Sequence, residues 1–161
     1  VADLTVKNPE KLAFVSQTTL SVDETADIVA ALRQKFPHIA SPNKDDICYA
    51  TQNRQDAVKA LADDCDLVIV VGSPNSSNSN RLRETAAKKG IHAIMIDNVG
   101  ELDTALLSNK KRIGITAGAS APEVLVQALV NVLHSLGYVS TDSADTQQET
   151  ISFVLPKELR N

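Results

Sequence analysis

Three stretches of small polar residues follow apolar runs and could bind an anion. GSPNSSNSNRL (72–82) follows DLVIVV, TTLS (18–21) follows KLAFVSQ, and ASAP (119–122) follows RIGITAG. A helix N-terminus offers free N–H groups and the positive end of the helix dipole, and Ser, Thr and Asn add neutral hydrogen-bonding groups. One helix needs only one or two capping residues, so 72–82 holds more of these side chains than capping explains. The pattern predicts a site for a compact, multiply charged anion such as a diphosphate.

Each stretch taken alone has a simpler explanation, because Ser and Asn at a helix start are usually N-caps. The sequence contains neither GxxxxGK[ST] nor GxGxxG, so no nucleotide motif is present. The lack of a P-loop lysine disfavours an NTPase.

Cys48, in KDDICYATQNRQ, precedes a predicted helix. A thiol at a helix N-terminus has a lowered pKa and is available as the thiolate, so it could act as a nucleophile or a metal ligand. A small buried filler is the alternative, and the residues alone leave the two open. Cys65, at a strand entrance, is expected to be such a filler. His38, His92 and His134 have no ligand spacing and are expected to be structural or exposed.

The elements that would position these residues alternate between strand and helix. Strands are predicted at 11–17, 66–72, 91–97 and 112–118, and helices at 18–36, 49–64, 79–89, 99–108 and 122–137. Ser21 and Glu24 form a capping-box pattern at the first helix, and Pro37 ends it. Apolar strands that alternate with helices are typical of parallel sheets covered on both faces, so the predicted fold class is α/β. Ligands bind such sheets at the carboxyl ends of the strands.

Composition excludes several classes of function. The net charge of -4 and the 3% aromatic content argue against nucleic-acid binding, which needs clustered cations and stacking side chains. No apolar run approaches the roughly 18 residues of a membrane span. Two cysteines and the absence of a secretion signal argue against a secreted disulfide scaffold, so a cytoplasmic location is expected.

Four stretches together resemble one enzyme family. QTTLSVDET, DDICYATQNRQ, GSPNSSNSNRL and TAGASAPEVLVQ, in this order, are similar to motifs of the 4-hydroxy-3-methylbut-2-enyl diphosphate reductases, which are LytB-type iron–sulfur enzymes. The resemblance extends to the tail ISFVLPKELR. It implies α/β domains in a pseudo-threefold arrangement around a [4Fe–4S] cluster. It also implies an oxidoreductase that reductively dehydroxylates (E)-4-hydroxy-3-methylbut-2-enyl diphosphate to isopentenyl and dimethylallyl diphosphate in the non-mevalonate isoprenoid pathway.

The resemblance also implies roles for individual residues. Cys48 would be one of three thiolate ligands of the cluster. Thr18 would lie by the substrate's allylic hydroxyl, in the proton-delivery network. The diphosphate would bind to hydroxyl and amide groups of Ser76, Ser77, Asn78 and Ser120.

Other motifs of the family have no match in this sequence. They are two further cluster cysteines, the substrate-binding histidines and a catalytic glutamate, all expected upstream of Val1. The chain is therefore predicted to be a C-terminal portion, and to be inactive and cluster-free on its own. Residues 1–45 would end the middle α/β domain, 46–137 would be the complete third domain, and 138–161 would be a tail with a returning strand at 151–156.

The resemblance implies an external electron donor such as flavodoxin or ferredoxin, and a cytoplasmic location of the bacterial type or a plastid. A non-redox α/β module that binds a phosphometabolite is the alternative function. A receiver-type signalling domain ranks last, because these loops carry hydroxyl groups where a receiver needs an acidic cluster.

Overall fold

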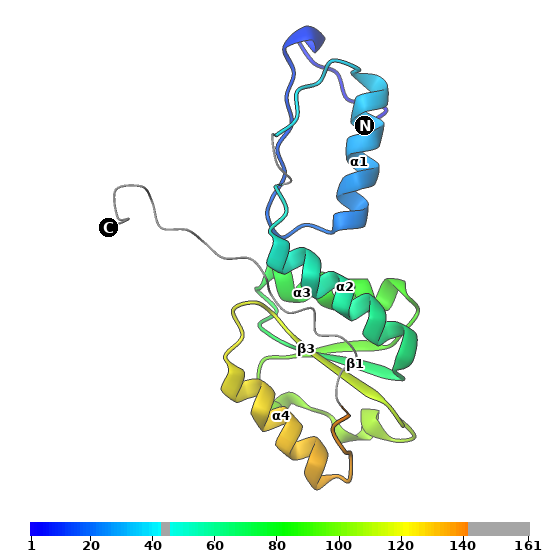
Figure 1. Cartoon of the computed structure of the whole chain (residues 1–161), viewed down its shortest axis with the longest axis vertical. Coiled ribbons are helices and arrows are strands. Elements are labelled where there is room, and N and C mark those ends of the chain that lie inside the picture. Colours follow the sequence, from blue (N-terminus) through cyan, green and yellow to red (C-terminus); the bar gives the residue numbers. More distant parts are fainter. Residues whose placement is uncertain (43–45, 142–161) are drawn as a thin grey trace, which may run out of the picture.

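The computed structural model describes residues 1–42 and 46–141. Three parallel strands form a sheet in the order β2-β1-β3 (Figure 1). In chain order, the elements are η1 (Pro9–Lys11), α1 (Val22–Lys35), α2 (Tyr49–Asp64), β1 (Leu67–Val71), α3 (Ser77–Lys88), β2 (Ala93–Ile96), η2 (Val99–Glu101), η3 (Thr104–Leu107), β3 (Ile113–Ala117) and α4 (Glu123–Ser135), where η denotes a 3-10 helix. The predicted α/β class is confirmed.

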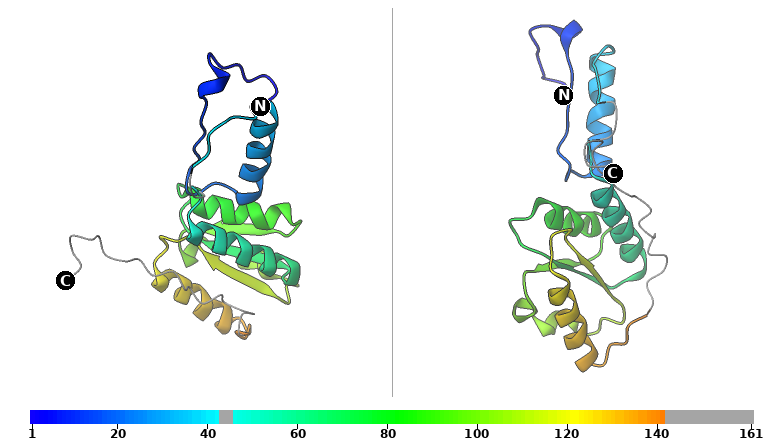
Figure 2. Two further views of the ribbon diagram at one scale, coloured as in Figure 1. Left: turned by 45° about the horizontal axis from the view of Figure 1, so that its top comes forward. Right: turned by 60° about the vertical axis from the view of Figure 1, so that its left-hand side comes forward.

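The central strand β1 joins two hydrophobic clusters, because all five of its residues are buried. Leu67, Ile69 and Val71 pack with Leu129 and Leu133 of α4 on one face of the sheet. The side chains in between point to the opposite face, as the twofold period of a strand requires. There Val68 and Val70 pack with Val58 of α2 and with Leu82 and Ala86 of α3. The result is a three-layer arrangement, with α2 and α3 on one face and α4 on the other (Figures 1 and 2).

Helix α1 begins after Ser21, as the capping-box pattern indicated, and not at residue 18. Its capping box is only half formed. The Ser21 hydroxyl accepts a hydrogen bond from the Glu24 N–H at 3.3 Å. The Glu24 side chain does not return the bond to the Ser21 backbone and instead forms an ion pair with Lys88 of α3. The first turn of α1 is thus connected to α3.

Helix α3 begins two residues before the predicted start at Ser79. Its N-cap is Ser76, whose hydroxyl accepts a hydrogen bond from the Ser79 N–H at 3.2 Å. The sequence does not fix this start, because several residues in the stretch can cap a helix. The predicted stop at Gly90 agrees with its φ of 85°, a conformation that favours glycine.

Two predicted elements differ from the structure. The predicted strand at 11–17 is reduced to a single parallel bridge between Ala13 and Ala40. The predicted short helix at 99–108 is two separate 3-10 segments, each started by an Asn or Asp side chain that accepts a backbone N–H. The predicted strand at 151–156, and most of the predicted tail, lie outside the described residues.

Residues 1–42 lie beside the three-layer part, and α1 meets it mainly through its first turn (Figure 2). None of the 14 residues of α1 is buried, and Ile28 is 53% exposed. No helix within the described residues is both long and apolar enough to cross a bilayer.

Candidate functional site

The ends of β1 and β3 converge on one buried serine at the start of α3. Gly72 follows β1 and Gly118 follows β3, and the Gly118 N–H donates to the Val71 carbonyl at 2.9 Å. Ser79 is 1% exposed, and a methyl group at either glycine would overlap its hydroxyl. Glycine at both positions therefore lets the first turn of α3 approach the two strand ends closely.

Asn78 lies next to this contact and has an unsatisfied side chain. The residue is 8% exposed, and neither Oδ1 nor Nδ2 has a hydrogen-bond partner among the described residues. Its Nδ2 lies 3.9 Å from the position that a Cβ on Gly118 would occupy. A buried polar group without a partner costs about 1–3 kcal/mol. Such a side chain at the carboxyl edge of the sheet is a candidate for binding a polar ligand.

The other polar residues of the loop divide into two groups. Ser73 accepts the Asn75 N–H at 3.3 Å, Ser76 caps α3, and Asn80 donates to the Pro74 carbonyl at 2.7 Å. Local backbone hydrogen bonds thus explain these side chains. They do not explain Asn78. As an N-cap, Ser76 uses its hydroxyl oxygen only as an acceptor, so its hydroxyl proton can still be donated to another group.

The remaining predicted diphosphate-binding residues lie at the same edge of the sheet. Ser77 is exposed in the first turn of α3, and Ser120 is exposed in the loop between β3 and α4. Ser120 is two residues from Gly118, so it shares the strand end that Asn78 approaches.

Thr18 and Cys48 are brought together by the backbone. Cys48 is the N-cap of α2, and its N–H donates to the Thr18 carbonyl at 3.0 Å. The Cys48 thiol is partly exposed and makes no capping hydrogen bond, so its sulfur is available to a ligand. Figure 1 shows the start of α2 and the loop between β3 and α4 on the same side of the domain.

Arg54 links these two parts of the site, and sequence reasoning missed it. Its Nη1 donates to the Ala117 carbonyl, at the end of β3, at 3.2 Å. Its Nε is buried and has no hydrogen-bond partner among the described residues. A single arginine in an amphipathic helix gives no sequence signal, because such residues are mostly solvent-exposed.

The described residues can supply one thiolate ligand of a [4Fe–4S] cluster but not the full set. Cys48 and Cys65 cap opposite ends of α2, which has 16 residues. At 1.5 Å per residue they lie roughly 24 Å apart, too far to share one cluster. Burial raises the pKa of the Cys65 thiol, which disfavours the thiolate that a metal needs. No group of three His, Cys, Asp or Glu gathers in the part of the chain that the structure describes.

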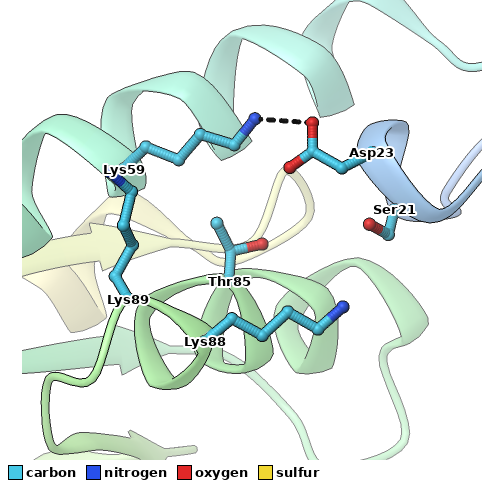
Figure 3. A pocket seen from close by; sticks show the side chains of 6 residues that line it. All are labelled: Ser21, Asp23, Lys59, Thr85, Lys88 and Lys89. Carbon is cyan, nitrogen blue, oxygen red and sulfur yellow. Dashed lines mark hydrogen bonds and ion pairs between the residues drawn. The ribbon is translucent and has the colours of Figure 1, made fainter. Parts of the chain in front are cut away.

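A small cavity lies where α1 meets α2 and α3 (Figure 3). It measures about 120 Å³, and its cations have carboxylate partners. Lys59 pairs with Asp23 at 3.1 Å, and Lys88 pairs with Glu24. We interpret these pairs as contacts between elements, because they already neutralise the lysines.

A larger cavity of about 410 Å³ separates α1 from the segments on either side of it. Apolar side chains such as Phe14 and Val29 line it, together with Ser16 and Arg33. Neither of these two cavities is lined by Asn78, Cys48 or Ser120.

The fold is an α/β domain, and the candidate residues lie at the carboxyl edge of its parallel sheet. The chain belongs to the LytB protein family, whose family model matches residues 1–134. It is 61% identical over 160 residues to the 4-hydroxy-3-methylbut-2-enyl diphosphate reductase of Neisseria meningitidis serogroup B, covering 99% of this chain and 50% of the relative. The reductase of Chromobacterium violaceum is 59% identical over 160 residues, with 99% and 51% covered.

Solved structures agree with this assignment. The E-1-hydroxy-2-methyl-but-2-enyl-4-diphosphate reductase of Plasmodium falciparum is 37% identical and superposes with a TM-score of 0.88, covering 98% of this chain and 50% of that chain. A second structure, of an (E)-4-hydroxy-3-methyl-but-2-enyl diphosphate reductase, is 28% identical with a TM-score of 0.54, covering 78% of this chain and 44% of that chain. The predicted family is confirmed. The chain spans about half the length of the curated relatives it matches, as expected for part of a longer enzyme.

Proposed function

We propose that this chain supplies the diphosphate-binding edge and one cluster cysteine of a 4-hydroxy-3-methylbut-2-enyl diphosphate reductase. The relatives' names give the reaction class. The buried, unpartnered amide of Asn78 at the carboxyl edge of the sheet carries the proposal for the site. A substrate diphosphate would satisfy this amide and gain the dipoles of the helices that begin beside it.

In this proposal, Asn78 Nδ2 donates to a phosphate oxygen. The hydroxyl groups of Ser76, Ser77 and Ser120 donate to others, since each lies at the start of α3 or in the loop before α4. The Ser76 hydroxyl donates while it accepts from Ser79, so the capping and binding roles are compatible. Neutral donors in a fixed frame hold the anion without a direct lysine contact.

The proposed reaction removes the allylic hydroxyl as water and consumes two electrons and two protons. A bound [4Fe–4S] cluster would supply the electrons. Cys48 would be one of its protein ligands, and the further thiolates would come from residues outside this chain. Thr18, whose carbonyl accepts the Cys48 N–H, would place its hydroxyl beside the leaving group. An external donor such as ferredoxin or flavodoxin and a cytoplasmic location stay predictions.

We also propose that residues 1–45 belong to a different α/β unit from residues 46–137. Supporting this, α1 buries none of its residues, and its flanking segments pair through one bridge only. The cavity of about 410 Å³ beside α1 is large enough to receive side chains from further strands. Light scattering tests this: exposed apolar surface should cause association, and a monomer that persists at all concentrations would contradict it.

Titration with inorganic pyrophosphate tests the binding site. Asn78→Ala should weaken pyrophosphate binding to the chain by about 10-fold or more, the value of one hydrogen bond to a charged group. Asn131→Ala is the control, because Asn131 is exposed on α4 and its side chain accepts a hydrogen bond from Gln127 on the same helix. Equal affinity of the Asn78→Ala variant and the unaltered chain would refute the proposed site.

The non-redox binding module makes the same pyrophosphate prediction, so a second experiment separates the two. Cys48→Ser, in a polypeptide of the relatives' full length, should abolish cluster absorption and turnover. Unchanged cluster absorption and turnover would refute the role of Cys48, and their absence from the unaltered full-length polypeptide would favour the binding module.

A further inference from the structure

Gln55 connects the cysteine-bearing helix to the segment that carries Thr18. It lies two turns after Cys48 on α2 and is 1% exposed. Its Oε1 accepts the Val22 N–H at 3.1 Å, and its Nε2 donates to the Leu20 carbonyl at 2.9 Å. One buried amide thus satisfies a donor and an acceptor on either side of Ser21, the N-cap of α1.

The polarity of this contact is fixed. Leu20 presents a carbonyl and Val22 presents an N–H, so only a side chain that donates and accepts in this arrangement satisfies both. The Val22 N–H belongs to the first turn of α1 and has no partner within its own helix. Losing either bond would leave a buried polar group unsatisfied, which costs more than an exposed hydrogen bond.

The same segment meets α2 a second time at the candidate site, where the Thr18 carbonyl accepts the Cys48 N–H at 3.0 Å. Residues 18–22 therefore touch α2 at its N-cap and again two turns later. The ion pairs nearby, Asp23 with Lys59 and Glu24 with Lys88, are partly exposed and contribute little. The hydrogen bonds of the buried Gln55 amide are the stronger connection between α2 and residues 18–22.

We propose that Gln55 is a positioning residue that holds Thr18 against Cys48. It touches neither the substrate nor a metal ligand and acts through the backbone of residues 20–22. The effect of this positioning on the reaction rests on the proposed function, because Thr18 and Cys48 face one substrate only if that function is correct. The hydrogen bonds themselves do not depend on that function.

Gln55→Glu tests the proposal through its dependence on pH. At neutral pH the carboxylate can accept from Val22 but cannot donate to the Leu20 carbonyl, whose lone pairs then face a negative charge. Below the pKa of the new side chain, the protonated acid can donate again. Amide hydrogen exchange of Val22 and Cys48, compared with the unaltered chain at the same pH, measures the local effect.

We expect exchange at Cys48 to be about 10-fold faster in Gln55→Glu at neutral pH, from the loss of one partly buried hydrogen bond. Exchange at Ile69 of β1 should change less, and the difference at Cys48 should shrink as the pH falls. Gln127→Glu is the matched control, because Gln127 is exposed on α4 and should change neither amide.

Val22→Pro provides a second variant that should still fold. It removes the N–H that Gln55 accepts, and proline is favoured at the first position of a helix. Ser21 already has φ −64° and ψ 127°, the conformation that a residue before proline prefers. This variant should also speed exchange at Cys48.

Unchanged exchange at Cys48 in both variants would refute the proposal. A loss of protection that is equal at Cys48 and Ile69 and independent of pH would refute it too, because Gln55 would then only stabilise the fold. Pyrophosphate titration distinguishes the two hypotheses: Gln55→Glu should still bind pyrophosphate, since the Gln55 side chain bonds to Val22 and Leu20 and not to the proposed diphosphate-binding residues. If the unaltered chain fails to bind pyrophosphate, the proposed function fails while the exchange result stands.

Discussion

Gly118→Ala should destabilise the chain through one defined steric conflict. A methyl group at Gly118 would overlap the hydroxyl of Ser79 and lie 3.5 Å from its Cβ. The hydroxyl cannot simply rotate away, because Gly72 approaches it from the other strand and Ser79 is 1% exposed. Overpacking of this kind costs about 1–3 kcal/mol. For a chain of this size, a loss of about 2 kcal/mol lowers the Tm by roughly 4–8 °C.

Four proteins measure the conflict: the unaltered chain, Gly118→Ala, Ser79→Ala and the double variant. Ser79→Ala removes the hydroxyl and so should restore most of the stability that Gly118→Ala loses. Urea unfolding should give a coupling free energy of about 1–2 kcal/mol between the two substitutions. Additive losses in the double variant would show that Ser79 is not what excludes a side chain at Gly118, and the close approach of α3 to the strand ends would be wrong.

Three further predictions follow from other contacts. Arg54→Met should cost about 1–2 kcal/mol of unfolding free energy, because the Ala117 carbonyl loses a charged donor, and urea unfolding that matches the unaltered chain would contradict this. Hydrogen bonds from the backbone N–H groups of Arg112 and Lys111 lower the pKa of Asp66 below its ordinary 3.8. The contribution of Asp66 to stability is therefore present above that pH and is lost as the pH falls through the lower pKa of the folded state. Asp66→Asn should flatten the dependence of the Tm on pH in acid, and an unaltered acid profile would exclude Asp66 as the source of that dependence. Reconstitution of the 161-residue chain with iron and sulfide should yield no complete [4Fe–4S] cluster, because Cys48 is the one cysteine at the site, and a full complement of iron and sulfide would overturn this.

The sequence predicts the layers well because burial and helical period are strong local signals. Every residue of LVIVV is apolar and every one is buried, so β1 was recognisable as a central strand. Residues 11–17 also contain a run of four apolar residues, LAFV, yet only Ala13 forms a bridge. A strand needs a partner as well as a pattern, and composition does not say where that partner lies.

The candidate site was only partly predictable for a related reason. Ser76 and Asn78 are both short polar residues at a helix start, but Ser76 caps the helix and Asn78 is buried without a partner. The packing of Ser79 between the strand ends, which the sequence does not show, decides which residue caps α3 and which is buried. Arg54 and Gln55 act across distances of 63 and 35 residues in sequence, so no local pattern marks them.

The placement of the two cysteines at opposite ends of α2 also governs how the chain responds to oxidants. A disulfide needs its two Cα atoms within about 7 Å of each other, and the length of the helix holds these far outside that limit. The folded chain therefore has no internal crosslink to form, and any disulfide that appears on storage in air joins two molecules. A covalent dimer joined through Cys48 would block the thiol that the proposed cluster needs.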